Sequence, residues 1–340
     1  MAEAKAISCP ANIDADLAVR PTSVREVDYY SSPATGTSRM IHHATPWLIL
    51  PSHAPQLRPL PVEQQNVIET QLRDRQRSMS RPASGVAMLL LDGPLSPSGE
   101  YGGTSLMRFQ QELADLIEDA STGLVVVVVD SPGGTYSQTG ETATMITEAR
   151  ARKSIVTFVG GNGMMASGAL WIGTAAGTVY ATPSARAVGS IGALMLHTEQ
   201  TRMLDEMGIT TEIIRRPAGK AKPNALEQLD DQTRQLMQAD IDDIYSEFVA
   251  AIVKQRKLKL SAVAGTDGRT FSTRDSVRLG LIDGVASWPT FIDQLASTTR
   301  RSQIHASGLH PRMKLSALRR DVLPPREPTR EEVVDALESN

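Results

Sequence analysis

The chain has 340 residues, a hydrophobic share of 41% and a formal net charge of −3. This charge argues against a protein that binds nucleic acid through a global basic field. Cys9 is the only cysteine, so the chain can form no internal disulfide and no thiolate metal cluster. The first residues lack the apolar core of a signal peptide, and no run approaches the roughly 20 apolar residues of a membrane-spanning helix. We therefore expect no nucleic-acid partner, no membrane anchor and a cytoplasmic location.

Residues 1–80 differ in composition from the rest of the chain. Prolines recur among polar clusters, which predicts an extended and partly disordered N-terminal extension. The stretch from Pro61 to Met79 is the exception, because its charged sequence follows a proline suited to a first helical turn and predicts a helix. The prolines on which this interpretation rests are Pro10, Pro21, Pro33, Pro46, Pro51, Pro55, Pro59 and Pro61.

From residue 85 the pattern becomes that of a globular domain. Short apolar runs predict strands over 86–93, 123–130 and 154–160, and helical spacing predicts helices over 104–120 and 139–151. The longest run, "LVVVVV", is typical of a fully buried parallel strand. Alternation of strands and helices implies an α/β fold whose parallel sheet is connected by right-handed crossovers.

The second half of the chain continues with mixed elements. We expect a helix over 199–207, a strand over 211–215 and a long helix over 229–258. The segment 270–287 predicts a helix that ends near Gly280, followed by a return strand. Three regions follow from these patterns: the extension 1–80, a domain over 85–297, and a charged, flexible tail over 298–340.

Two loops in the domain carry the chemistry. The strand that ends at Asp130 runs into "SPGG", whose two glycines let the backbone turn sharply and expose N–H groups at the carboxyl edge of the sheet. Ser167, in "GNGMMASGALW", comes at the next strand-to-helix junction. The N–H groups of Gly134 and Gly168 could therefore converge on one oxygen and form an oxyanion hole beside a nucleophilic serine.

A nucleophilic serine needs a general base, and the residues leave two candidates. His197 lies at the end of an apolar stretch, where a histidine is more often simply solvated. Lys222 lies in "RPAGKAKPNA", where Lys220 is also available. A lysine acts as a base only when it is neutral, and burial of a lysine favours that form. Composition alone does not choose between the histidine and the lysine.

Several motifs together resemble a known family. The chain from about Gly85 to Leu295 is similar to the serine–lysine peptidases of the signal peptide peptidase A and phage capsid protease group. The similarity rests on four motifs in unbroken order and on the long helix that follows them. In chain order they read "VVVDSPGG", "GMMASGALWIGTAA", "ARAVGSIGALMLHTE", "AGKAK" and "LDDQTRQLMQADIDDIYSEFVAAIVKQR".

The resemblance implies a fold, a site and a reaction. The fold is the crotonase-like superhelix of the caseinolytic protease, with a parallel sheet. Ser167 is the nucleophile, Lys222 is the base, and the amides of Gly134 and Gly168 hold the oxyanion. Only these groups are required, so no cofactor and no metal are implied. Small residues beside Ser167 suggest that the substrate adds as a strand with small apolar side chains next to the cut.

Members of that family have different biological roles. The absence of an apparent anchor favours a phage or prophage head-maturation protease that cuts scaffold, portal or major capsid protein, and possibly its own ends, in the host cytoplasm or procapsid. The resemblance also implies a homo-oligomer. Alternatives are a signal-peptide-peptidase-like bacterial protease, a Ser–His triad that uses His197, a crotonase-type acyl-CoA enzyme, and a non-catalytic assembly subunit with the same fold.

Overall fold

A computed structural model describes residues 46–54, 58–80 and 85–295. These residues belong to one compact unit that begins at Met40. The charged tail 298–340 and the first 45 residues of the extension lie outside the described residues, so their expected flexibility stays a prediction.

A five-stranded parallel sheet forms the centre of the domain. The order of its strands is β10-β7-β5-β3-β2, and every neighbouring pair is parallel. The predicted parallel α/β architecture is therefore confirmed. The strands are β2 (Val86–Asp92), β3 (Leu124–Asp130), β5 (Ser154–Val159), β7 (Val179–Ala181) and β10 (Gly284–Val285).

The continuous apolar runs of these strands bury both faces of the sheet. In β2, Leu89 and Leu91 join the larger core, whereas Met88 and Leu90 point into a second core on the opposite face. Among the helices that supply apolar side chains to the larger core are α2 (Leu106–Glu118), α3 (Thr139–Ala149) and α4 (Gly168–Thr174). Helix α2 begins at Leu106, two residues after the predicted start, because the Ser105 side chain accepts the N–H of Arg108 as a cap.

Two small β-structures lie beside the main sheet. One contains β6 (Met164–Ala166) and β8 (Ala187–Gly189), which are parallel, with β9 (Thr270–Phe271) antiparallel to β8. The other pairs β1 (Trp47–Ile49) antiparallel to β4 (Gly133–Thr135). Strands β4 and β6 carry the two loops in which the sequence places the chemistry.

Two elements of the N-terminal extension pack on the domain. Helix α1 (Val62–Met79) begins one residue after Pro61, and its Leu72 and Met79 contact the second core. Strand β1 is almost completely buried. The region that the sequence separates as 1–80 therefore contributes two packed elements to the same unit.

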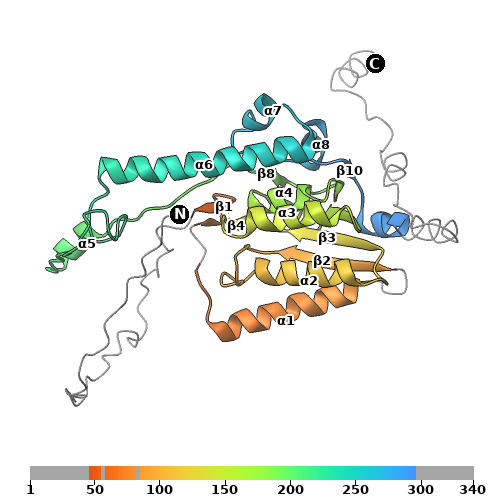
Figure 1. Ribbon diagram of the computed structural model, residues 1–340, viewed down its shortest axis with the longest axis horizontal. Helices are drawn as coiled ribbons and strands as arrows, with labels where there is room; N and C mark the ends of the chain where they lie inside the picture. Colours follow the sequence, from red (N-terminus) through yellow and green to blue (C-terminus); the bar gives the residue numbers. More distant parts are fainter. Residues whose placement is uncertain (1–45, 55–57, 81–84, 296–340) are drawn as a thin grey trace, which may run out of the picture. The chain divides into compact units, whose positions relative to one another are not determined.

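The long helix α6 (Asp231–Arg256) runs along the molecule between two groups of short helices (Figure 1). Helix α5 (Thr201–Glu206) lies toward its first turn, and α7 (Leu260–Ala264) and α8 (Thr273–Arg278) lie toward its last. The buried apolar residues of α6 all lie in its second half, where Phe248 stacks on Trp171 of α4 with ring centroids 5.1 Å apart. None of the described helices has both the length and the apolar character needed to cross a membrane.

The strand expected over 211–215 is wrong. These residues form no ladder with another segment, and the side chain of Ile214 is 92% exposed. Their β-branched residues favour extended backbone, but a strand also needs a partner for its N–H and C=O groups. No sheet edge of the described domain pairs with them.

Candidate active site

Ser167 stands between β6 and α4 in a strained conformation. Its φ is 54°, a region that residues with a side chain rarely adopt. Its N–H donates to the carbonyl of Gly189 in β8 at 2.8 Å. The preceding residue, Ala166, donates its N–H to the carbonyl of Ser131 at 3.1 Å, which ties β6 to the "SPGG" loop. The small sheet and this loop therefore determine the conformation of Ser167 from both sides.

The Ser167 side chain is completely buried. Its Oγ lies 3.5 Å from the carbonyl oxygen of Gly192, a long and weak hydrogen bond. No other hydrogen bond of this hydroxyl occurs among the described residues. The serine is thus held by its backbone, while its hydroxyl is weakly engaged.

The glycine loops come together beside Ser167. A Cβ atom placed on Gly133 would lie 3.0 Å from the nitrogen of Gly168 and 2.1 Å from the carbonyl oxygen of Leu48. A Cβ on Gly134 would lie 1.8 Å from the carbonyl oxygen of Leu95. Only glycine fits at 133 and 134, because the backbones approach this closely. The structure therefore brings the "SPGG" loop, through Gly133, against the residue that follows Ser167, while the oxyanion hole of Gly134 and Gly168 stays a prediction.

The position of Gly168 in the helix leaves its N–H available as a hydrogen-bond donor. It is the first residue of α4, so its N–H lacks an intrahelical acceptor. The positive end of the helix dipole adds a favourable field for an anion at the same point. This N–H would be in place to donate to a carbonyl oxygen that became negative there.

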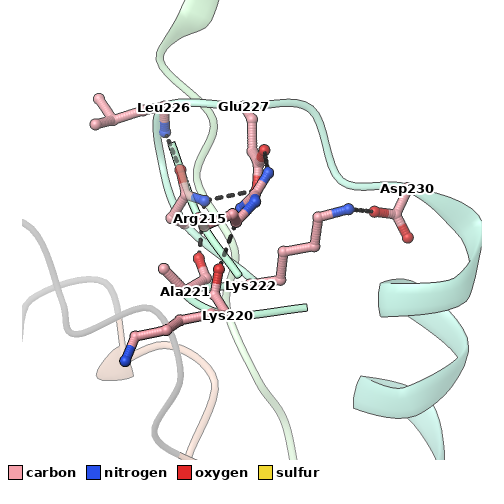
Figure 2. A network of polar contacts seen from close by, with 8 residues as sticks. Arg215, Lys220, Ala221, Lys222, Leu226, Glu227 and Asp230 are labelled. Carbon is pink, nitrogen blue, oxygen red and sulfur yellow. Dashed lines mark hydrogen bonds and ion pairs between the residues drawn. The ribbon is translucent and has the colours of Figure 1, made fainter. Parts of the chain in front are cut away.

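Lys222 lies elsewhere, in the segment that precedes α6. Its Nζ forms an ion pair with Asp230, the residue that caps α6 (Figure 2). The Lys222 ammonium holds the pKa of the Asp230 carboxyl well below its usual range, and the Thr233 N–H that it accepts lowers that pKa further. No hydrogen bond joins Lys222 to Ser167 among the described residues, so the structure does not assemble the expected dyad.

Lys220 and His197 take different positions around the same segment. Figure 2 shows the Lys220 side chain directed away from Asp230, on the opposite side of the loop from Lys222. His197 lines a small recess together with Lys222, Asn224 and Asp230. Neither residue forms a hydrogen bond to Ser167 among the described residues. The choice of base therefore stays a prediction.

Sequence reasoning missed a strand at this site. Trp47–Ile49 lies directly against β4, and the carbonyl of Leu48 is among the nearest atoms to both Gly133 and Gly168. The signal in the sequence is "PWLILP", four apolar residues between two prolines inside an otherwise polar region. A run that short, isolated from other elements, gives no indication of which sheet it joins.

Comparison with known proteins finds similarity to peptidases. The model of peptidase family S49 matches residues 148–301, a range that contains both Ser167 and Lys222. A putative protease of Synechocystis sp. is 28% identical over 49% of this chain and 60% of its own length. The head-tail preconnector protein GP5 of Enterobacteria phage P21 is 28% identical over 64% of this chain and 42% of its own.

A further relative comes from a second phage. The capsid assembly protease C of Escherichia phage lambda is 25% identical over 62% of this chain and 48% of its own length. The chain spans about half the length of the curated relatives it matches. The parallel α/β sheet agrees with this match, and over residues 148–301 the chain is similar to peptidase family S49.

Proposed function

We propose that this protein is a serine endopeptidase that works with Ser167 and Lys222. The observation that carries the proposal is the position of Ser167, at a strained helix start where the glycine loop of β4 meets the first N–H of α4. The carbonyl oxygen of Leu48 already lies close to both Gly133 and Gly168. We also propose that the observed α/β fold is the crotonase-like superhelix that the sequence resemblance implies.

The reaction follows from these groups. Neutral Lys222 takes the proton of Ser167 while Oγ attacks the carbonyl carbon of a peptide bond. The N–H groups of Gly134 and Gly168 stabilise the negative oxygen, and each such donor contributes about 3 kcal/mol to transition-state stabilisation. The protonated lysine then gives its proton to the leaving amine. Water hydrolyses the remaining ester and regenerates the serine.

This reaction requires Lys222 to leave Asp230. In the ion pair the lysine is an ammonium, which has no lone pair to accept a proton. Either the segment that carries Lys222 moves to Ser167 of its own chain, or a second copy supplies it. Exposed apolar side chains on that segment support the second route and the homo-oligomer, because an interface between copies would bury them. They include Met203, Met207, Ile209, Ile214 and Leu226.

For the biological role we propose maturation of a phage or prophage head, in the host cytoplasm or procapsid. The substrates are scaffold, portal or major capsid protein, and the relatives from phages P21 and lambda support this choice by their names. A signal-peptide-peptidase-like bacterial protease is the second candidate, favoured by matches to cellular proteases such as that of Synechocystis.

The test is proteolysis with and without the serine. The native chain and a Ser167→Ala variant are incubated alone and with an unfolded protein substrate, and the products are measured by mass spectrometry. We expect cleavage only with the native chain, and an unchanged thermal transition for the variant, because only a hydroxyl is lost. Residual turnover of the variant within tenfold of the native rate would remove Ser167 as the nucleophile, and a native chain without activity would favour an assembly subunit.

A further inference from the structure

Strand β1 lies in a groove with a backbone partner on each side. On one side Trp47, Leu48 and Ile49 pair antiparallel with Thr135, Gly134 and Gly133. On the other side the Trp47 N–H donates to the carbonyl of Leu194 at 2.9 Å, and the Leu194 N–H donates back at 3.0 Å. A segment held in this way is bound as an added strand, the mode in which extended peptides bind to sheet edges.

The register places one carbonyl at the oxyanion position. The Tyr136 N–H donates to the carbonyl of Pro46, and the Leu50 N–H donates to the carbonyl of Pro132. Hydrogen-bonded pairs recur at every second residue of an antiparallel ladder, so Leu48 and Gly134 form the pair between these two. The Leu48 carbonyl therefore faces the N–H of Gly134, the donor assigned to the oxyanion.

Distances to the other glycines agree with this register. The Leu48 carbonyl oxygen lies 2.1 Å from the Cβ position of Gly133 and 3.1 Å from that of Gly168. The Leu48 Cβ lies 3.3 Å from the same position on Gly168. Leu48 thus stands beside the residue that directly follows Ser167, where the acyl residue of a substrate has to stand.

The residues of this strand and Ser167 are buried together in the domain. Leu48 and Ser167 are both 0% exposed, and Trp47 is 1% exposed. Trp47 packs edge-on against Tyr101, with ring centroids 5.1 Å apart. Ile49 belongs to the same small core. An external peptide cannot pair with β4 while this strand occupies the same backbone groups.

We propose that Trp47–Ile49 is an internal peptide ligand that occupies the substrate groove and closes it to other peptides. Its chemistry defines the ligand class: an extended, apolar segment with leucine at the acyl position. The Leu48 side chain lies in the main core, so this position accepts a side chain larger than the small ones expected from the sequence. The inference rests on the proposed peptidase reaction for its meaning, although its test needs no catalysis.

Peptide binding to the full chain tests this inference. The probe is a fluorescent peptide TPWLILP, which copies residues 45–51, and every chain carries Ser167→Ala to prevent cleavage. Trp47→Gly is added to release β1 by removing its largest buried contact, and Val62→Gly is the matched control, since Val62 is exposed in α1. We expect the Trp47→Gly chain to bind the probe at least tenfold more tightly than the Ser167→Ala and control chains.

Selectivity and folding are measured in the same series. A probe with aspartate in place of the leucine after tryptophan should bind at least tenfold more weakly to the released groove. If Trp47→Gly lowers the thermal transition sharply, Tyr101→Ala replaces it, because it removes only the edge contact on Trp47. Equal binding by released and unreleased chains, or no binding by folded released chains, overturns the inference. Loss of peptidase activity in the native chain would leave this result unaffected.

Discussion

An ion pair lies at each end of α6, and the two pairs differ in exposure and in what they join. At the last turn, Arg256 and Asp283 pair at 3.1 Å, and each side chain is only 6% exposed. Asp283 also accepts the N–H of Val179 in the central sheet at 2.9 Å. At the first turn, Lys222 and Asp230 pair with side chains that are 28% and 39% exposed. One pair joins the helix to the core, whereas the other closes a loop at the surface.

The same contrast separates the two halves of the proposed dyad. Ser167 is held between β6, β8 and α4 in the interior. Lys222 belongs to residues 198–232, here called the arm, in which no residue is buried. Low contact with the core allows local rearrangement at low free energy. The comparison teaches that the proposed nucleophile is held by the core, while the proposed base lies on an arm that has little contact with the core.

Removing the base should have the largest effect. Lys222→Ala is expected to lower peptidase activity at least about a thousandfold, as much as Ser167→Ala, because residues that act as one unit are not additive. The matched controls are Lys220→Ala and His197→Ala, which should change the rate less than tenfold. Rates on an unfolded protein substrate give the measurement. If His197→Ala is the inactive variant, a Ser–His triad replaces the dyad.

Mixing two inactive chains asks which copy supplies the base. Ser167→Ala and Lys222→Ala chains are unfolded together, refolded and assayed. If the arm of one copy serves the serine of the next, about one quarter of the sites in a closed, randomly mixed oligomer combine an intact serine with an intact lysine. We expect the mixture to regain about one quarter of the activity of the native chain.

A doubly substituted chain is the control for this mixture. Ser167→Ala refolded with Ser167→Ala/Lys222→Ala contains no intact serine and should stay inactive. A mixture of the two single variants that also stays inactive would mean that each arm reaches the serine of its own chain.

Much of the part of the site that contains Ser167 could be predicted from the sequence. Apolar runs such as 124–129 predict buried parallel strands, and the glycines of "SPGG" predict a tight turn at the strand ends. These signals are local, because the spacing of apolar residues, the composition and the turn residues can each be recognised within a short segment. The order of strands then brings Gly134 and Ser167 to the same edge, and β3 and β5 are indeed neighbours.

The rest depends on contacts that no local pattern encodes. The residues 211–215 have the composition of a strand but no partner, and Ile214 points into solvent. Conversely, Trp47–Ile49 lies in a proline-rich region and still pairs with β4, more than 80 positions further along the chain. Pairing partners are tertiary information, and the same is true of the ion pair that holds Lys222 away from Ser167.

The two ion pairs should differ strongly in their contribution to stability. Asp283→Ala leaves Arg256 buried without its partner, and such changes typically cost about 3 kcal/mol or more of unfolding free energy. Asp230→Asn removes the surface pair but keeps a side-chain oxygen that can cap α6, so the urea midpoint should change little. Urea unfolding of Ser167→Ala chains measures both without self-cleavage. Equal destabilisation by the two variants would contradict the division between core and arm.

The smallest expected effect is the pH dependence of the surface pair. Because Lys222 lowers the pKa of Asp230 in the folded chain, the folded state binds a proton at this site less readily than the unfolded chain does. The stabilisation is therefore fully present above the ordinary aspartate pKa of about 3.9 and is lost as the pH falls below it toward the folded-state pKa. Two Ser167→Ala chains are compared, one with Asp230 and one with Asp230→Asn. Their urea midpoints should differ by a constant small amount between pH 7 and pH 5. That difference should shrink in more acidic solution and also in high salt, since the pair is exposed. A difference that grows with acidity would reverse the sign of the linkage and would mean that Lys222 does not stabilise the Asp230 carboxylate.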